Sequence, residues 1–526
     1  MKETNTPEKN KKGFSDIFRK KTIERTVSET KESGRNLKRS ISALELALMG
    51  VAVAVGAGIF SVGGQVVAFH AGPAAVVSFL IAGVVCALAV MCYAEFAAMA
   101  PAAGSAYSYT YMTMGEIFAW IIGWDLILEM LFSSAVIAKY WGVYLNDFCS
   151  LMGMHINSTI VLCGIKIDLA SFFIVAFFTL LLMWGTNISS KFDSILTVVK
   201  IGVVLFIIVA GFMYFNPDNF SPFIPEARPA AEVTGESSVM MQPLWQWLSG
   251  SAPTAYGVPG IISGAALVFF AFIGFDVVAT VSEEVKDPSK NVPRGIIFGI
   301  SAVVVIYMLI AFVTAGMVPY DKLAQAGNTS LTTSFSLVGA DWAAKIISFG
   351  ILIGLTTVVM VLLLGFARII FAISRDGLLP RSFSKTGRHG TPAMLQLGCG
   401  IIVFLILNSF DIAVLSDMIN IGTLSSFVLV AIDIPIMRRR RPDAKRTIKV
   451  PGNPWLPIII ALSCFGLMIN LSVMTWIRFL IWMALGFIVY FGYSHKHSLL
   501  NKKAGKAEEN ERLEAQNGKT ETLASE

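Results

Sequence analysis

Charged residues gather at the two ends of this sequence and are scarce in its long middle part. Residues 1–43 and 494–526 together hold 30 of the 76 charged side chains, which leaves 46 for the 450 residues between them. Only 14% of the chain is charged, against about 25% in ordinary soluble domains. Because so few charges cannot cover the surface of a water-soluble domain, the middle part predicts a polytopic membrane protein with two hydrated tails.

Hydropathy divides the middle part into about twelve apolar segments, each near the roughly 20 residues that a helix needs to cross a bilayer. They lie near residues 44–70, 73–100, 115–146, 168–187, 195–215, 259–282, 294–318, 343–374, 392–410, 415–437, 454–473 and 475–493. Lysine and arginine concentrate in the loops on the side of the N-terminus, above all in the run 438–441. The positive-inside rule therefore predicts that both termini are cytoplasmic.

Several classes of protein do not fit this sequence. A long basic stretch precedes the first apolar segment with no cleavage site, so we expect the N-terminal tail to stay in the cytoplasm. The net charge of +6 then reflects topology and not nucleic-acid binding. No metal site or cofactor is expected, because the six cysteines form no CxxC or Cys/His cluster. Cys149 and Cys163 fall near one outer loop, where two free thiols are favoured over a disulfide. No HExxH or nucleophile elbow indicates an enzyme.

Two apolar segments contain features that interrupt helices. The first has Gly56, Ala57 and Gly58 at its centre, and glycine at this density weakens a helix in mid-membrane. The sixth has a phenylalanine-rich stretch at 269–273 followed by Gly274 and Asp276. Interrupted segments at corresponding positions of two halves are typical of transporters with inverted repeats and a substrate site at the bilayer midplane.

The backbone exposed at such breaks suits an amino acid zwitterion. N–H groups freed at Gly56–Gly58 lie at the positive end of a half-helix and favour a carboxylate. Carbonyls freed near Ala54, Val55 and residues 270–272 favour an ammonium group. Glycines that only let helices pack closely are the alternative, and for a single Gly-x-Gly that alternative is the better one. Two breaks in a chain with twelve segments favour a binding site.

An ionisable residue inside the membrane is costly, so each one indicates a function by default. Lys200 lies near the start of the fifth segment. Its ammonium can snorkel to the inner interface. Alternatively, it can occupy a site between the first, fifth and eighth helices and exchange a proton during transport. The residues alone support the two roles equally.

The acids of the second and third segments are further candidates. Asp125 and Glu129 share one face of the third segment, and the deeper Glu129 is the better candidate for a proton site or a substrate-facing carboxylate. Lys139 lies about 15 Å along the same helix from Glu129, too far to pair with it. Glu95, like Arg368, is expected to form an ion pair near the cytoplasmic end of its segment.

Ordered motifs along residues 38–493 resemble those of the amino acid–polyamine–organocation (APC) superfamily, and more narrowly its cationic-amino-acid-transporter-like branch. The motifs are Gly56-Ala-Gly-Ile-Phe60, Ala71-Gly-Pro73, Tyr93-Ala-Glu95-Phe96, Gly104-Ser-Ala-Tyr107, Gly-Trp-Asp-Leu-Ile-Leu-Glu at 123–129, Gly274-Phe-Asp276 and Ser374-Arg-Asp-Gly-Leu-Leu-Pro380. The resemblance implies an all-α polytopic membrane protein with a LeuT-type core of five-plus-five inverted repeats and two extra C-terminal helices. It divides the chain into a tail (1–40), a twelve-helix amino acid permease domain (41–493) and a second tail (494–526).

The resemblance also implies roles for particular residues. Gly56, Ala57 and Gly58 would hold the substrate carboxylate. The rest of the site would be lined by Ala54, Val55, Ile59, Phe270, Ala271, Phe272 and Ile273. Lys200 matches a family lysine that replaces a sodium ion and couples transport to protons, and Glu129 matches an acid that recurs in the branch. Thr356 and Thr357 would face the former sodium site near Lys200.

Together these features predict a multi-pass transporter in the plasma membrane of a bacterium, a monomer or weak oligomer, that imports amino acids by proton symport and alternating access. Neutral substrates are favoured over cationic ones, because no extra acid is evident for a cationic side chain and an unpaired buried charge is costly. A cationic amino acid transporter and a proton-independent exchanger are the alternatives within this class. An amino acid sensor that signals through the tails without net transport is a further one.

Overall fold

The computed structural model describes most of the chain between the two tails. The described residues are 18–20, 41–56, 58–99, 105–154, 158–162, 165–184, 189–234, 238–272, 274, 285–327, 329–385, 392–444, 446 and 448–501. Everything stated below refers to these residues.

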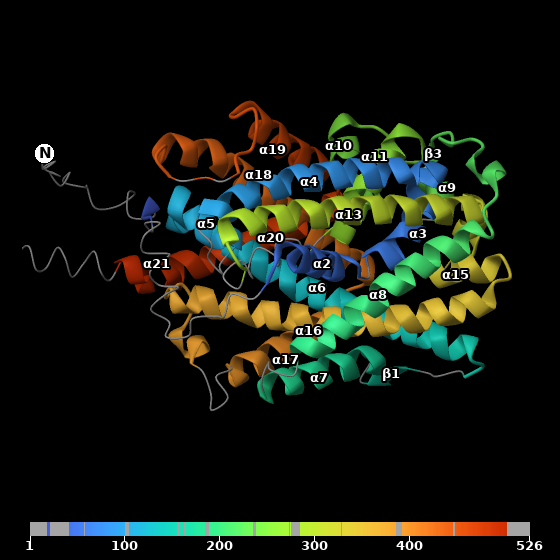
Figure 1. Ribbon diagram of the computed structural model, residues 1–526, viewed down its shortest axis with the longest axis horizontal. Coiled ribbons are helices and arrows are strands. Elements are labelled where there is room, and N and C mark those ends of the chain that lie inside the picture. The colour runs from blue at the N-terminus through green and yellow to red at the C-terminus, as the bar shows by residue number, and fades with distance from the viewer. Residues whose placement is uncertain are drawn as a thin grey trace, which may run out of the picture.

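Helices that run side by side along one axis make up the molecule (Figure 1). The main ones are α2 (Ala43–Ala54), α4 (Ala75–Met99), α6 (Glu116–Leu151), α7 (Leu169–Trp184), α8 (Ser189–Phe212), α11 (Gly257–Val268), α13 (Pro288–Met317), α16 (Asp341–Arg375), α17 (Ala393–Ser409), α18 (Ile412–Arg440), α19 (Trp455–Met468) and α20 (Val473–Val489).

Short elements connect these helices. The helical ones are α5 (Ser105–Thr113), η5 (Pro217–Phe220), α9 (Ala230–Thr234), η6 (Val239–Met241), α10 (Leu244–Ser249), α14 (Tyr320–Gln325), α15 (Leu331–Leu337), η9 (Arg381–Ser384), η10 (Tyr490–Ser494) and α21 (His495–His497). Two antiparallel strand pairs also occur, β1 (Thr159–Leu162) with β2 (Ile165–Asp168), and β3 (Arg228–Pro229) with β4 (Thr254–Ala255).

The predicted all-α polytopic membrane fold is confirmed. Within the described part of the chain, six helical stretches have the length and apolar composition to cross a membrane, and six shorter apolar helices accompany them. Large apolar side chains on the outward faces of α7, α17, α19 and α20 are exposed, among them Phe173, Ile401, Leu462 and Leu480. A bilayer would cover such a surface, whereas water would not favour it.

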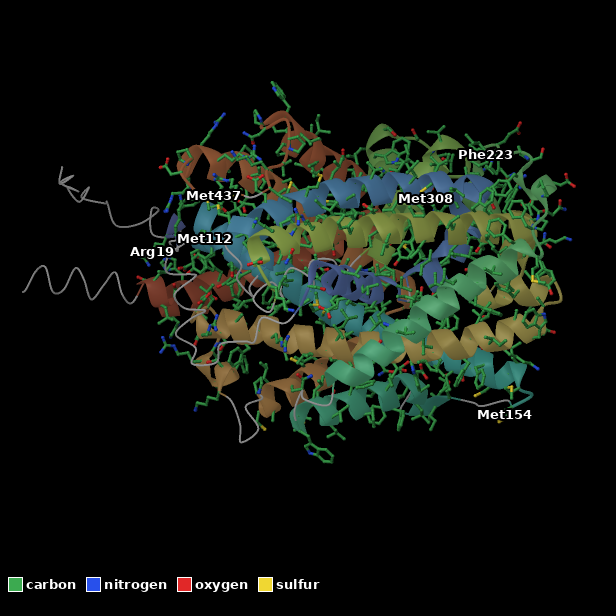
Figure 2. All side chains as sticks on the ribbon, in the orientation of Figure 1. Arg19, Met112, Met154, Phe223, Met308 and Met437 are labelled. Carbon is green, nitrogen blue, oxygen red and sulfur yellow. The ribbon has the colours of Figure 1, made fainter. Side chains whose placement is uncertain are left out.

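The two ends of the bundle differ in what they carry. One end holds α21 and is called the α21 end here, and the other holds β1 and α15 and is called the β1 end (Figure 1). Figure 2 places Arg19 and Met437 toward the α21 end and Met154 and Phe223 toward the β1 end. Helix α6 runs through the centre from Glu116 to Leu151 and packs against α16, α17 and α18.

The first predicted segment is divided into two helical parts, as its glycines indicate. Helix α2 begins with a capping box, in which the Ser42 hydroxyl accepts from the Glu45 N–H and the Ser42 N–H donates to the Glu45 carboxylate. It ends at Ala54. Helical structure resumes as η2 (Gly58–Val62), followed by α3 (Gly63–Gln65), η3 (Val66–Ala71) and η4 (Gly72–Ala74).

The sixth predicted segment also changes its helical form where the sequence predicts. Helix α11 ends at Val268 and continues as a single 3₁₀ stretch, η7 (Phe269–Phe272). Gly274 then has φ of +106°, a conformation that favours glycine. Ile273 and Asp276 lie outside the described residues.

Parts of both predicted tails pack against the bundle at the α21 end. The Glu116 N–H donates to the Arg19 carbonyl (2.8 Å), and the Phe18 ring lies against Phe118. At the other terminus, the Ser498 hydroxyl donates to the Glu116 carboxylate (2.6 Å) and the Leu499 N–H donates to the Asp376 carbonyl (3.1 Å). The packed structure therefore extends to both sides of the expected 41–493 domain.

Three of the side-chain expectations can be compared with the structure directly. Glu95 forms the expected ion pair, and its partners are Arg438 and Arg446. Cys149 is a buried free thiol, and Cys163 lies outside the described residues. The Lys139 ammonium donates to the Phe410 carbonyl, so this lysine points toward the turn between α17 and α18.

Candidate functional site

A small cavity lies between the two interrupted segments and the central helices. Its described lining residues are Val53, Ala54, Gly56, Gly58, Ser133, Ile137, Phe270, Gly274, Val358 and Leu362. The free space is about 30 Å³, enough for about one water molecule. An amino acid is larger than this free space.

The structure brings four of the predicted substrate residues to this cavity, namely Ala54, Gly56, Gly58 and Phe270. Four others, Val55, Ile59, Ala271 and Phe272, are buried in the same broken segments but are not among the lining residues. Ala57 and Ile273 lie outside the described residues.

The end of α2 is completed by side chains from two other helices. The last carbonyls of a helix lack partners within it, so they need donors from elsewhere. The Lys200 ammonium from α8 donates to the Ala52 carbonyl at 3.0 Å. The Tyr307 hydroxyl from α13 lies 2.5 Å from the Ala54 carbonyl. A cation at the C-terminal end of a helix is also favoured by the helix dipole.

Lys200 therefore lies inside the bundle. Its side chain is 3% exposed and passes beside Gly354 of α16, where an added Cβ would come within 3.2 Å of the lysine Cγ. The ammonium thus lies among the first, fifth and eighth predicted segments. Of the two placements that the sequence analysis left open for Lys200, the structure shows the one between these helices.

Tyr307 is a site residue that the sequence analysis did not single out. Its hydroxyl reaches the carbonyls of both broken segments, Ala54 at 2.5 Å and Ala271 at 2.9 Å. A hydroxyl has one proton and can donate to only one of them at a time. These are carbonyls that the sequence assigns to the substrate ammonium.

The two glycines of the first break have different surroundings. A Cβ on Gly58 would lie 2.3 Å from the Ala271 Cα, so this glycine is required for direct contact between the two broken segments. A Cβ on Gly56 would lie 3.6 Å from a Val358 methyl carbon, which is ordinary contact. Gly58 therefore allows two helical segments to pack closely and also lines the cavity. Gly56 has room for a methyl group.

A polar stripe on α6 passes the cavity. Glu129, Ser133 and Tyr140 recur at helical spacing, and all three are buried. Ser133 lines the cavity, and Glu129 lies one turn, about 6 Å, from it toward the α21 end. Asp125, one further turn along, accepts from the Ser425 hydroxyl of α18 at 2.5 Å.

The two threonines of α16 are differently placed. Thr357 is buried and lies one turn from Gly354, the residue that Lys200 passes. Thr356 instead accepts a hydrogen bond from the Trp141 indole of α6 at 2.9 Å. The structure thus places Thr357 on the Lys200 side of the helix and Thr356 on the α6 side.

Further contacts join α6 to neighbouring segments beyond the cavity, toward the β1 end. The Tyr144 hydroxyl of α6 donates to the Phe60 carbonyl of η2 at 2.7 Å. Gly64 lies so close to the Thr329 carbonyl that a Cβ would be 1.8 Å away. The Ser330 and Thr332 hydroxyls donate to Asp147 of α6 at 3.3 and 3.1 Å.

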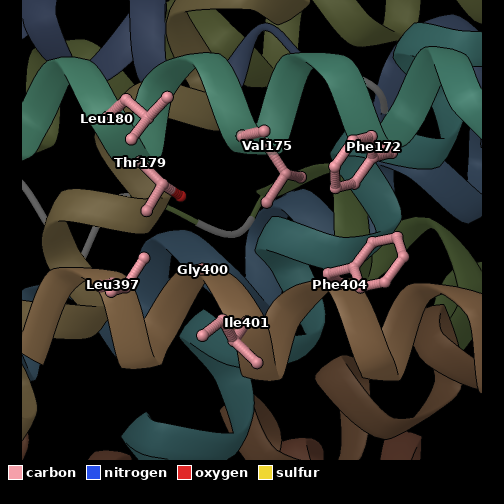
Figure 3. Close-up of a pocket in the computed structure, with 9 residues that line it drawn as sticks. Phe172, Val175, Thr179, Leu180, Leu397, Gly400, Ile401 and Phe404 are labelled. Carbon is pink, nitrogen blue, oxygen red and sulfur yellow. The ribbon is translucent and has the colours of Figure 1, made fainter.

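A larger cavity of about 200 Å³ lies elsewhere, between α7 and α17 (Figure 3). Its lining is apolar except for Thr179, with Val175, Leu397 and Phe404 among the facing residues. Both helices form one flank of the bundle (Figure 1) and expose large apolar side chains there. This cavity has no freed backbone groups or charges, so the smaller one is the better candidate for a polar substrate.

Comparisons of the sequence with known proteins identify its family. Residues 41–493 match the amino acid permease family. The methylthioribose transporter of Bacillus subtilis is 38% identical over 93% of this chain and 100% of its own length. The branched-chain amino acid permease BcaP of Bacillus subtilis is 36% identical over 92% of this chain and 99% of its own length. The vacuolar cationic amino acid transporter 4 of Arabidopsis thaliana is 33% identical over 82% of this chain and 68% of its own length.

These relatives are named as transporters or permeases and not as enzymes. The family match covers most of the chain and spans both broken segments, Lys200 and α6. The resemblance to the APC superfamily inferred from the motifs is therefore confirmed, and the chain belongs to the amino acid permease family.

Proposed function

We propose that this permease imports neutral amino acids across the plasma membrane by proton symport and alternating access. The observation that carries the proposal is the uncharged cavity between two interrupted helices. None of its ten described lining residues bears a charge. A cationic side chain buried there would lack a counter-charge and would be costly to desolvate.

The architecture proposed for this function is a LeuT-type core with both termini in the cytoplasm. The breaks after Ala54 and in η7 lie at corresponding points of the first and sixth segments. The basic run Arg438–Arg441 directly follows Met437, which Figure 2 places toward the α21 end. Because such basic runs favour the cytoplasm, the α21 end is the cytoplasmic one in this proposal.

Lys200 supplies the proton coupling in this proposal. Its ammonium replaces a bound cation at the C-terminal end of α2, where it donates to the Ala52 carbonyl. Loss of its proton removes that charge and weakens the link between α2 and α8. Protonation therefore favours one arrangement of α2 over another, which is how a proton can drive a conformational cycle.

Two other substrate classes have specific support. The Arabidopsis relative is named as a cationic transporter, and Glu129 lies one helical turn from the cavity, where it could face a cationic group. The Bacillus relative is named as a methylthioribose transporter. A pentose has several hydroxyls to satisfy, however, and the described lining provides one side-chain hydroxyl, Ser133. Neutral amino acids fit the lining better than either alternative.

The test is uptake into proteoliposomes that hold the purified full-length protein. Labelled alanine, leucine and arginine are supplied with a pH gradient, inside alkaline, and without it, and unlabelled methylthioribose is added as a competitor. We expect gradient-dependent accumulation of alanine or leucine. Preference for arginine would overturn the neutral assignment. Uptake of leucine that ignores the gradient would identify an exchanger, and ligand-stabilised protein without any flux would identify a sensor.

A further inference from the structure

The wall of the cavity consists of two kinds of surface. The interrupted segments contribute Val53, Ala54, Gly56, Gly58, Phe270 and Gly274. The continuous helices α6 and α16 contribute Ser133, Ile137, Val358 and Leu362. A continuous helix uses its backbone groups internally, so α6 and α16 offer side chains alone. In an amino acid site built this way, the broken segments bind the ammonium and carboxylate, and α6 and α16 face the substrate's side chain.

Ser133 is the polar exception in the α6 and α16 wall. Among the described lining residues, it carries the one side-chain hydrogen-bonding group, and it is 2% exposed. Among the described residues, its hydroxyl has no hydrogen-bond partner. The next residue, Ser134, behaves as serines in membrane helices usually do and donates to the Met130 carbonyl one turn back at 2.7 Å.

A buried hydroxyl without a partner costs free energy that a bound ligand can recover. We propose that Ser133 is the specificity-determining residue for the substrate's side chain, and that it admits a hydroxylated, β-branched side chain into an otherwise aliphatic compartment. Threonine and valine have this shape and differ by one hydroxyl in place of a methyl group. The inference rests on the proposed function and adds the substrate class to it.

Selectivity follows from the pairing of hydroxyls. With Ser133 present, the threonine hydroxyl can form a hydrogen bond with it. When valine binds instead, the Ser133 hydroxyl stays unpaired, as it is in the empty site. Without Ser133, the threonine hydroxyl is buried against Ile137, Val358 and Leu362 with no partner, whereas valine meets a fully apolar wall. A site that hydrogen-bonds a substrate hydroxyl discriminates strongly between substrates with and without it. The wrong combination of site and substrate leaves a buried polar group without a partner.

The experiment measures counterflow of labelled threonine and valine in proteoliposomes, which needs no gradient. The proteins are the full-length chain, Ser133→Ala and the matched control Ser134→Ala, whose hydroxyl is bonded within its own helix. We expect Ser133→Ala to lower kcat/KM for threonine relative to valine by about fivefold to tenfold, the effect of one hydrogen bond. Ser134→Ala should leave the ratio unchanged.

An unchanged threonine-to-valine ratio in an active Ser133→Ala protein would overturn the inference. If Ser133→Ala does not fold, Ser133→Cys serves instead, because a thiol is a weak donor of similar shape and should lower the ratio in the same direction. Transport of leucine but of neither threonine nor valine would reject the inference and leave the proposed function standing. A protein that moves no amino acid at all would reject the proposed function itself.

Discussion

Gly56 and Gly58 are two positions apart, yet the absence of a side chain serves a different purpose at each. Gly58 lets the first broken segment touch Ala271 of the sixth, and Gly56 keeps space free in the cavity beside Val358. A sequence shows both as mid-membrane glycines and predicts one shared role in holding a carboxylate. The three-dimensional neighbours that separate them lie more than 200 residues away along the chain.

Substitutions at the two glycines should therefore fail in different ways. Gly58→Val places atoms inside the Ala271 backbone, so we expect a protein that melts at a clearly lower temperature in detergent and does not transport. Gly56→Ala meets Val358 at ordinary contact distance and should melt near the wild-type temperature. Its methyl group occupies cavity space, so its KM should rise. Equal melting temperatures for Gly58→Val and the wild type would contradict this difference.

At the scale of elements, the positions of the two helix breaks could be predicted from the sequence. The side chains that stabilise the broken ends could not. Glycine density and the apolar context indicate where α2 ends and where α11 changes form. Nothing local indicates that Lys200 and Tyr307 complete the end of α2, because they come from α8 and α13. A lysine within an apolar segment is rare, so the sequence indicates a function for Lys200. A buried tyrosine in an apolar helix is common, so Tyr307 gave no such signal.

Tyr307→Phe tests the link between the two broken segments. The substitution keeps the ring against Phe272 and removes the hydroxyl beside the Ala54 and Ala271 carbonyls. Leaving a buried carbonyl without a donor costs about 1–3 kcal/mol, so the variant should melt at a lower temperature. Tyr214→Phe is the control, since its hydroxyl accepts a long hydrogen bond of 3.4 Å from the Trp342 indole. Equal thermal stability of Tyr307→Phe and Tyr214→Phe would argue against the link.

At the scale of the whole molecule, a buried ion cluster joins distant parts of the chain at the α21 end. Glu95 of α4 accepts from the Arg438 guanidinium of α18 at 2.9 and 2.5 Å and from the Val450 N–H at 2.7 Å. Arg446 lies 3.4 Å from the same carboxylate. The sequence predicted an ion pair for Glu95, and its partners became evident only when the chain was folded, since they are more than 340 residues away.

Removing the charge of Glu95 should destabilise the whole bundle. Glu95→Gln leaves two guanidinium groups facing each other in a site where Glu95 is 3% exposed. Breaking one partner of a buried ion pair costs about 3–5 kcal/mol, so the melting temperature in detergent should fall markedly. Asp321→Asn breaks the exposed pair with Arg228 and should change it little. A Glu95→Gln protein as stable as Asp321→Asn would contradict the role of the cluster.

The helix pattern, the twelve apolar segments and the family could all be predicted, because hydropathy and motifs are local in sequence. The contacts between distant elements around the site could not. Examples are Tyr144 with Phe60 and Ser330 with Asp147, which join elements far apart in the chain. The packing of residues 18–20 and 494–501 on the bundle was also missed, since their polar composition is that of a hydrated tail.

The central claim is that a proton on Lys200 drives accumulation of a neutral amino acid through the broken-helix site. The most direct measurement is leucine accumulation in proteoliposomes with a pH gradient, inside alkaline, for the wild type, Lys200→Ala and the control Lys139→Ala, with counterflow recorded in parallel. We predict that Lys200→Ala loses gradient-driven accumulation and keeps part of its counterflow, while Lys139→Ala keeps both. Gradient-driven accumulation by Lys200→Ala at the wild-type level would contradict the account.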